Sequence, residues 1–127
     1  MKKKGHHEEL VAGVTEQMKP VLENSSQAIY IYLDDEHKVC NQRFADLLGY
    51  KSPEEWADTD APLSDVVEED QPGVIEAYIN ASEKMLASSN EVKMMNVKTG
   101  RIVKTRMIIA PVSYAGHVFT VHFFNKI

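Results

Sequence analysis

The sequence has little of what marks several classes of protein. Its 127 residues include one cysteine, so an internal disulfide is excluded and a reducing compartment is favoured. No apolar run approaches the roughly 20 residues of a membrane-spanning helix, and no hydrophobic segment follows the basic start MKKK. The net charge of -5 gives no basic footprint for nucleic acid. We therefore expect a cytoplasmic protein that neither inserts into a membrane nor binds nucleic acid.

Residue patterns of catalysis and metal binding are also missing. The sequence has no nucleophile elbow, phosphate-binding loop or paired-carboxylate spacing, and its five histidines do not follow a metal-ligand spacing. The single cysteine, Cys40, is interpreted as a small packing residue, because free cysteines are usually buried. The sequence therefore predicts neither an enzyme nor a metal site.

The sequence does contain a dense set of helix boundaries between residues 39 and 56. Asn41 can cap a helix whose apolar residues follow at helical spacing, and Gly49 can end that helix. Ser52 and Glu55 form a capping box, with a proline between them at the first helical position. These signals predict two short helices separated by a sharp corner.

An amphipathic helix is expected at the N-terminus. Leu10, Val14 and Met18 recur on one stripe, and Pro20 is expected to end or kink the helix. Such a helix has too little apolar surface to be stable alone. It must therefore dock on the rest of the chain or on a second copy of itself.

A long helix and five strands complete the predicted elements. The helix is expected from Asp70 to about residue 87, and the strands at residues 28–33, 38–40, 91–98, 101–112 and 117–125. This order predicts an α+β domain over residues 21–127, with a five-stranded antiparallel sheet and helices on one face. The strands are apolar on both faces, so the N-terminal helix of residues 1–20 or a partner subunit is expected to cover the other face.

This order of elements resembles the PAS domain, a sensory and interaction module of signalling proteins. The likeness starts with VLENSSQAIYIYLDDEHKVCNQRFADLLGY and SPEEW, and continues in the hairpin VKTGRIVKTRMIIAPV and the final strand GHVFTVHFFN. No single piece is specific, but the ordered set is. The resemblance implies a role in signal transduction, with any ligand held between the sheet and the helices.

The resemblance also implies a test for two cofactors. Light-oxygen-voltage relatives place a reactive cysteine before the long helix. The corresponding segment of this sequence, ADTDAPLSDVVEED, has no cysteine. Flavin-binding relatives line the sheet with amides, where this chain has Met95, Thr105 and Phe123. Haem-binding relatives use a histidine on the long helix, and residues 71–87 contain none. No cofactor is therefore expected, neither flavin nor haem, and the one candidate ligand is an unidentified apolar small molecule.

Alternation along the strands predicts which residues form the wall of the cavity between sheet and helices. The expected wall is apolar and includes adaptable methionines. It consists of Ile29, Ile31, Leu33, Ile75, Tyr78, Ile79, Met95, Met107, Ile109, Phe119, Val121 and Phe123. The sequence leaves two alternatives open, a filled core and a pocket for an apolar or aromatic molecule.

The opposite face of the sheet is the predicted interface of a homodimer. Its expected residues are Leu10, Val14, Met18, Tyr30, Tyr32, His122 and Phe124. The preferred interpretation is a non-catalytic signalling module that forms this homodimer and contacts an unidentified signalling partner. The alternative is a sensor that binds a small molecule in the cavity.

Overall fold

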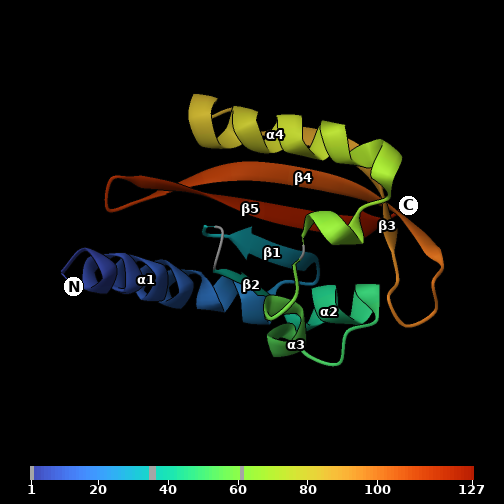
Figure 1. Cartoon of the computed structure of the whole chain (residues 1–127), viewed down its shortest axis with the longest axis horizontal. Helices are drawn as coiled ribbons and strands as arrows, with labels where there is room; N and C mark the ends of the chain where they lie inside the picture. Colours follow the sequence, from blue (N-terminus) through green and yellow to red (C-terminus); the bar gives the residue numbers. More distant parts are fainter. Residues whose placement is uncertain (1, 35–36, 61) are drawn as a thin grey trace.

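A computed structural model shows a five-stranded antiparallel sheet between two layers of helices (Figure 1). The structure describes residues 2–34, 37–60 and 62–127, with side chains from residue 8 onward. In chain order the elements are α1 (Lys2–Asn24), β1 (Ala28–Tyr32), β2 (Lys38–Cys40), α2 (Gln42–Leu48), α3 (Pro53–Ala57), η1 (Leu63–Asp65), η2 (Glu68–Asp70), α4 (Gln71–Lys84), β3 (Ser88–Met95), β4 (Ile102–Tyr114) and β5 (His117–Lys126). The strand order is β2-β1-β5-β4-β3, so the first strand pairs with the last. The predicted α+β fold is confirmed.

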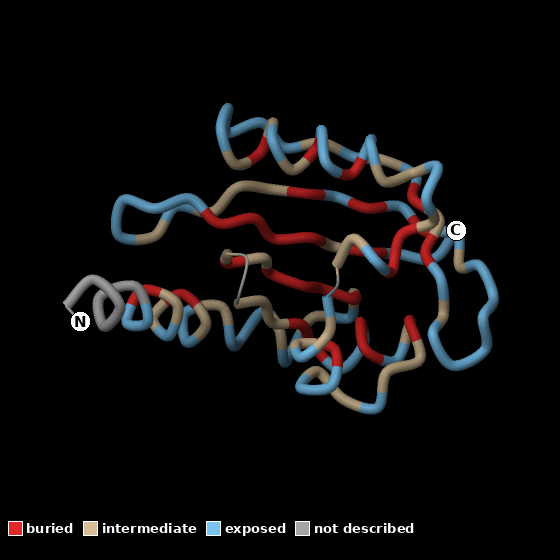
Figure 2. Tube along the Cα trace, in the orientation of Figure 1, coloured by how far each residue is buried: buried red, intermediate tan, exposed pale blue. Residues whose placement is uncertain are grey.

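The two faces of the sheet are covered by different helices. We call the face covered by α2, α3 and α4 the inner face, and the face covered by α1 the outer face. The inner face joins strand residues such as Tyr30 and Met107 to Phe44 and Trp56 of the short helices. The outer face joins α1 to the sheet through one cluster: Val14, Ile29, Ile31, Leu33, Phe119 and Val121. Burial is highest where β1 and β5 run between these layers (Figure 2).

The short helices α2 and α3 form as the sequence predicts. The Asn41 side chain accepts a hydrogen bond from the Phe44 N–H at 3.0 Å and so caps α2. The same oxygen accepts the Ile29 N–H, which ties α2 to β1. Gly49 ends α2 in the left-handed conformation, with a φ of 84°, and Ser52 caps α3. The caps therefore fix both helices against the β1 end of the sheet.

Helix α1 lies on the sheet of its own chain, which is one of the two predicted positions. It continues through Pro20 to Asn24, so of the two expected effects of Pro20, an end or a kink, the end is wrong. The proline removes one backbone donor. The helix survives this loss because Leu22, beyond the proline, packs in the outer cluster as Val14 does before it.

Gly13 lets the β4–β5 hairpin approach α1 closely. A Cβ atom at this position would overlap the hydroxyl of Tyr114 at the end of β4. Glycine inside a helix costs about 1 kcal/mol relative to alanine. Here the close contact with Tyr114 gives the glycine a packing role.

The boundary between α4 and β3 comes earlier than the sequence suggests. Helix α4 ends at Lys84 because Met85 adopts the left-handed conformation, with a φ of 56°. Strand β3 therefore begins at Ser88 instead of at residue 91. Its turn into β4 is held by Asn96, whose side chain accepts two backbone N–H groups.

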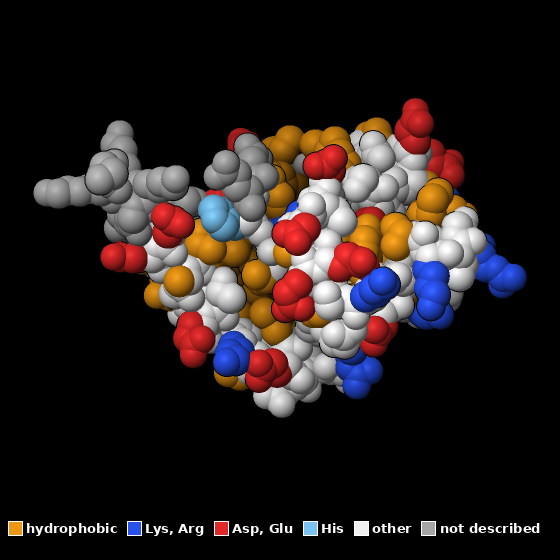
Figure 3. Space-filling model, turned by 60° about the horizontal axis from the view of Figure 1, so that its bottom comes forward, with side chains coloured by type: hydrophobic (Ala, Val, Ile, Leu, Met, Phe, Trp, Pro, Cys, Tyr) orange, Lys and Arg blue, Asp and Glu red, His pale blue; other side chains and the backbone are white. Residues whose placement is uncertain are grey.

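The surface carries charges of both signs. Acidic side chains are spread over the face that includes α1, and basic side chains gather toward the end of the molecule away from the N-terminus (Figure 3).

Among the described residues, no helix combines the length and the apolar character that crossing a membrane requires.

Val14 is the buried centre of the contact between α1 and the sheet, with 1% of its surface exposed. We expect Val14→Ala to lower the free energy of unfolding by about 2 kcal/mol, because two buried methyl groups are lost and a cavity remains. Chemical denaturation measures this change. Gln17→Ala on the exposed side of α1 is the control, and equal effects of the two substitutions would contradict the docking of α1.

Candidate functional site

The β4–β5 hairpin determines which strand residues face the inner layer. Its turn consists of two residues, Ala115 and Gly116, which both have positive φ angles of 50° and 81°. This geometry is typical of the type I′ turn, which matches the twist of paired strands. The resulting register places Ile109 opposite His122. Both residues therefore lie on the inner face.

Tyr30 lies at the centre of the inner face. It pairs with His122 across β1 and β5, and the two rings stack with their centroids 4.0 Å apart and an angle of 15° between their planes. Phe44, Trp56 and Phe124 surround Tyr30 with centroid distances of 5.2, 5.2 and 5.6 Å. These aromatic contacts hold the Tyr30 and His122 rings in one orientation.

A pocket of about 200 Å³ lies between these rings and α4. Its lining comes from β1, β5, α4 and the η1 segment, and consists of Tyr30, Tyr32, Pro62, Leu63, Val74, Ile75, Tyr78 and His122. Tyr32 and Tyr78 meet edge to face at 5.4 Å. Among the described residues, the titratable side chains of this lining are its tyrosines and its histidine. The pocket is therefore aromatic and apolar with one imidazole.

Asp65 holds the η1 wall of the pocket in place. Its buried carboxylate accepts a hydrogen bond from the Tyr50 hydroxyl at 2.6 Å and another from the Trp56 indole N–H at 2.9 Å. Burial raises the pKa of Asp65, and the two hydrogen bonds oppose this shift. The Gln71 amide donates to the carbonyl oxygens of Leu63 and Val66 and joins η1 to the start of α4. The wall is thus fixed by polar contacts outside the pocket.

His122 supplies a polar atom without a partner. Its Nδ1 has no hydrogen-bond partner among the described residues, and the residue is only 2% exposed. Burial lowers the pKa of His122 to about 3, although a hydrogen bond to the backbone of Tyr30 opposes the shift. The ring is therefore neutral near pH 7. Thr120, two residues away on the same strand face, has the second buried polar atom of this kind, its Oγ1.

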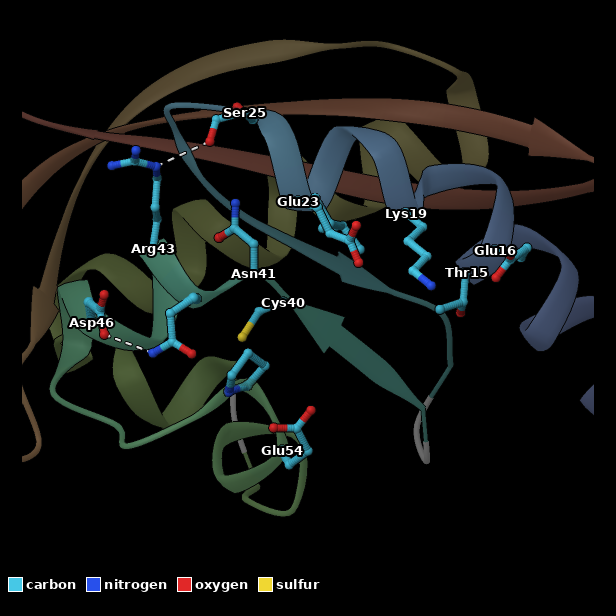
Figure 4. A pocket seen from close by; sticks show the side chains of 13 residues that line it. Thr15, Glu16, Lys19, Glu23, Ser25, Cys40, Asn41, Arg43, Asp46 and Glu54 are labelled. Carbon is cyan, nitrogen blue, oxygen red and sulfur yellow. Dashed lines mark hydrogen bonds between the residues drawn. The ribbon is translucent and has the colours of Figure 1, made fainter.

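A larger groove of about 870 Å³ lies between α1, α2 and α3 (Figure 4). Its lining is polar and carries both signs of charge, with Lys19 and Glu23 from α1 and Arg43 from α2. Cys40 also lines it, and burial raises the pKa of this thiol to about 12. The thiol is therefore protonated near pH 7 and is not an activated nucleophile. Among the described residues, no three potential metal ligands come together here or elsewhere.

The structure changes the predicted wall of the cavity. Ile75 and Tyr78 line the pocket, and Met107 and Ile109 are buried on the inner face. The expected position is wrong for six strand residues, which pack on the outer face beneath α1: Ile29, Ile31, Leu33, Phe119, Val121 and Phe123. Ile79 and Met95 are partly exposed and lie outside the lining. Pro62, Leu63 and Val74 also line the pocket and are not among the expected wall residues.

The predicted dimer surface is changed as well. Leu10 and Val14 are buried within the monomer, and Met18 packs beside them on the outer cluster. The expected outer position is wrong for four strand residues, which face the inner layer instead: Tyr30, Tyr32, His122 and Phe124. In β1 and β5, the residues of each predicted set therefore lie on the face opposite to the expected one.

The length of the β4–β5 turn is the sequence signal that identifies the correct face. With a two-residue turn, Met107 lies opposite Phe124 and shares its face. With a three-residue turn, Met107 would lie opposite Phe123, and every residue of β5 would be exchanged between the faces. Pro62 and Leu63 have no comparable signal, because only tertiary packing brings them to the pocket.

The sequence matches no protein-family model and no curated protein, but its fold is shared with many solved structures. The PAS domain of a Colwellia psychrerythraea protein is similar with a TM-score of 0.69 and 19% identity, over 90% of this chain and 97% of that one. A PAS domain from a two-component sensor histidine kinase has a TM-score of 0.64 and 14% identity, over 91% and 97%. A Rhodobacter sphaeroides LOV protein has a TM-score of 0.72 and 11% identity, over 91% and 68%. This chain therefore has the fold of PAS domains.

The buried imidazole makes stability depend on pH. The pKa of His122 is about 3 in the folded protein, below the ordinary value near 6.5, so the unfolded chain binds the extra proton first as the pH falls. The contribution of the neutral His122 ring to the free energy of unfolding is complete above about pH 6.5 and is lost as the pH falls toward 3. Between pH 7 and 5, we expect the free energy of unfolding to fall about 2 kcal/mol further in the wild type than in His122→Phe. Chemical denaturation of both proteins at the two pH values measures this difference. An equal fall in the free energy of unfolding in the wild type and in His122→Phe would contradict this assignment.

Proposed function

We propose that this chain is a sensory signalling module that binds a small uncharged molecule in the pocket between β1, β5 and α4. The observation that carries the proposal is the pocket itself, about 200 Å³ of space lined by aromatic and aliphatic side chains. Binding sites for small molecules are typically concave and apolar with few polar groups. A sensory role is supported by the similarity to a PAS domain from a two-component sensor histidine kinase.

The sheet offers a short route from the pocket to α1. In β1, Tyr30 and Tyr32 line the pocket, and the residue between them, Ile31, packs in the outer cluster with Val14 of α1. In β5, His122 lines the pocket and its neighbour Val121 faces α1. A ligand that binds one arrangement of these strands better than another would shift the population toward it and change the docking of α1.

The proposed module is non-catalytic and acts in the cytoplasm. It uses neither flavin nor haem. Among the described residues, the lining has no amide side chain, and its histidine lies on β5 instead of on the long helix, where the haem-binding relatives place theirs. Its mixed surface charge and net charge of -5 favour a protein partner in signalling over nucleic acid.

Filling the pocket tests the proposal. Val74 is a buried lining residue, and we expect Val74→Phe to place its ring in the pocket. A panel of uncharged aromatic compounds should include one that raises the Tm of the wild type, since a ligand at about 100 times its Kd adds about 2.7 kcal/mol to the free energy of unfolding. The substitution should remove this ligand-induced increase.

Ile79→Phe is the matched control, because Ile79 lies on the same helix, is partly exposed and does not line the pocket. It should retain the increase in Tm. A wild type that gains no stability from any compound, and that carries no small molecule in native mass spectrometry, would contradict a ligand-binding function.

Self-association is a second candidate function. The observation that favours it is a row of exposed apolar side chains along α4, in which Ile75 and Ile79 lie one turn apart and Leu86 follows beyond the helix end. These side chains are 44%, 39% and 53% exposed. Two copies of such a row could pack against each other and bury it.

Sedimentation tests this second function. We expect the wild type to sediment as a dimer and Ile79→Glu as a monomer, because a carboxylate buried in an apolar interface is unfavourable. Val97→Glu is the control, since Val97 is also an exposed apolar residue but lies in the turn after β3. A monomeric wild type would contradict this interface and leave the ligand-binding proposal unaffected.

A further inference from the structure

We propose that the pocket selects a flat aromatic molecule with one uncharged hydroxyl group, and that this hydroxyl forms a hydrogen bond with the side chain of His122. The inference rests on the proposed function, because it specifies the ligand class of the same pocket. Three properties of the lining carry it: its size, its aromatic geometry and its single imidazole.

The size of the pocket limits the ligand to one or two rings. A dry cavity of about 150 Å³ in another protein accommodates benzene. The pocket here measures about 200 Å³, so it has room for a second ring or for substituents on one ring. Because Ile75 in its lining is 44% exposed, the pocket reaches the surface, and a ligand can enter beside α4.

The lining favours a flat molecule. The stacked rings of Tyr30 and His122 form one side, and the edge-to-face pair of Tyr32 and Tyr78 forms another. Aromatic ligands can make offset stacked and edge contacts with such surfaces. The remaining lining side chains are aliphatic: Pro62, Leu63, Val74 and Ile75.

The imidazole of His122 explains the preference for a hydroxyl group, because among the described residues it is the one lining side chain that contains nitrogen. A ligand group that pairs with an imidazole nitrogen forms a hydrogen bond that an apolar ligand lacks. A neutral imidazole has one donor nitrogen and one acceptor nitrogen. A hydroxyl group can donate and accept, so it can pair with an imidazole nitrogen in either tautomer.

The charges around the pocket disfavour an ionised ligand. Among the described residues, the lining has no lysine, arginine, aspartate or glutamate to balance a ligand charge. The carboxylate behind the lining, Asp65, already pairs with Tyr50 and Trp56, and its field acts on Tyr30. A negative ligand would therefore be repelled, and a ligand hydroxyl would stay protonated.

A pair of probes that differ by one hydroxyl group tests this inference. We would measure the Kd of 2-naphthol and of naphthalene by calorimetry or fluorescence at pH 7.5, and expect the wild type to bind 2-naphthol about tenfold more tightly, as one net hydrogen bond would give. His122→Phe keeps an aromatic ring against Tyr30 but lacks the nitrogen. Its two Kd values should differ by less than about twofold.

His117→Phe is the control, because His117 is exposed on the same strand and lies outside the lining. It should keep the tenfold preference. A third probe, 2-naphthoate, should bind at least about tenfold more weakly than 2-naphthol, since it brings a charge into the pocket.

The outcomes separate this inference from the proposed function. If the wild type binds none of the probes or any other aromatic compound, the proposed function fails. If both uncharged probes bind equally, or if the preference persists in His122→Phe, the pocket binds ligands but His122 does not select the hydroxyl. Nitrogen NMR of the wild-type imidazole gives a readout without substitution. 2-Naphthol should shift a ring-nitrogen resonance of His122 and naphthalene should not, and equal shifts would overturn the inference.

Discussion

The pairing of β1 with β5 determines how every layer of this protein meets the sheet. Tyr30 lies opposite His122 in this register, and the neighbouring pair, Ile31 and Val121, points to the other side. A slip of one residue would exchange both sets, so that the aromatic pair would face α1 and the aliphatic pair would face the pocket. The pocket, the docking of α1 and the burial of the imidazole all depend on this one register.

Local signals were sufficient for the fold but not for the faces of the sheet. Side-chain capping by Asn41 and Ser52 and the left-handed Gly49 follow from short-range chemistry, which the sequence displays directly. The assignment of strand residues to the two faces does not follow in this way. Both sides of β1 and β5 are apolar, so alternation alone does not determine which side meets which helices. The turn at Ala115 and Gly116 contains the missing information, since its length fixes the register.

The η1 wall of the pocket shows a second limit of sequence-based prediction. The run of residues from 58 to 70 looks like an acidic loop, and nothing local indicates that one of its carboxylates is buried. Asp65 becomes buried because Tyr50 and Trp56 converge on it from the corner between α2 and α3. Buried carboxylates persist when hydrogen bonds compensate for lost hydration, so the helix corner stabilises the wall at a distance. Leu63 reaches the pocket only as a consequence of this arrangement.

His122 is the point at which stability and the proposed function conflict. Its neighbours on the inner face, such as Ile109 and Phe124, are apolar, and a phenylalanine at position 122 would avoid both the unpaired nitrogen and the loss of stability at low pH. Local rules of packing and hydrogen bonding are most often violated at functional sites, where the cost is offset elsewhere in the structure. The violation here lies in the lining of the aromatic pocket and one residue away from a strand position that contacts α1. Its location therefore favours a role in ligand recognition over a role in the core.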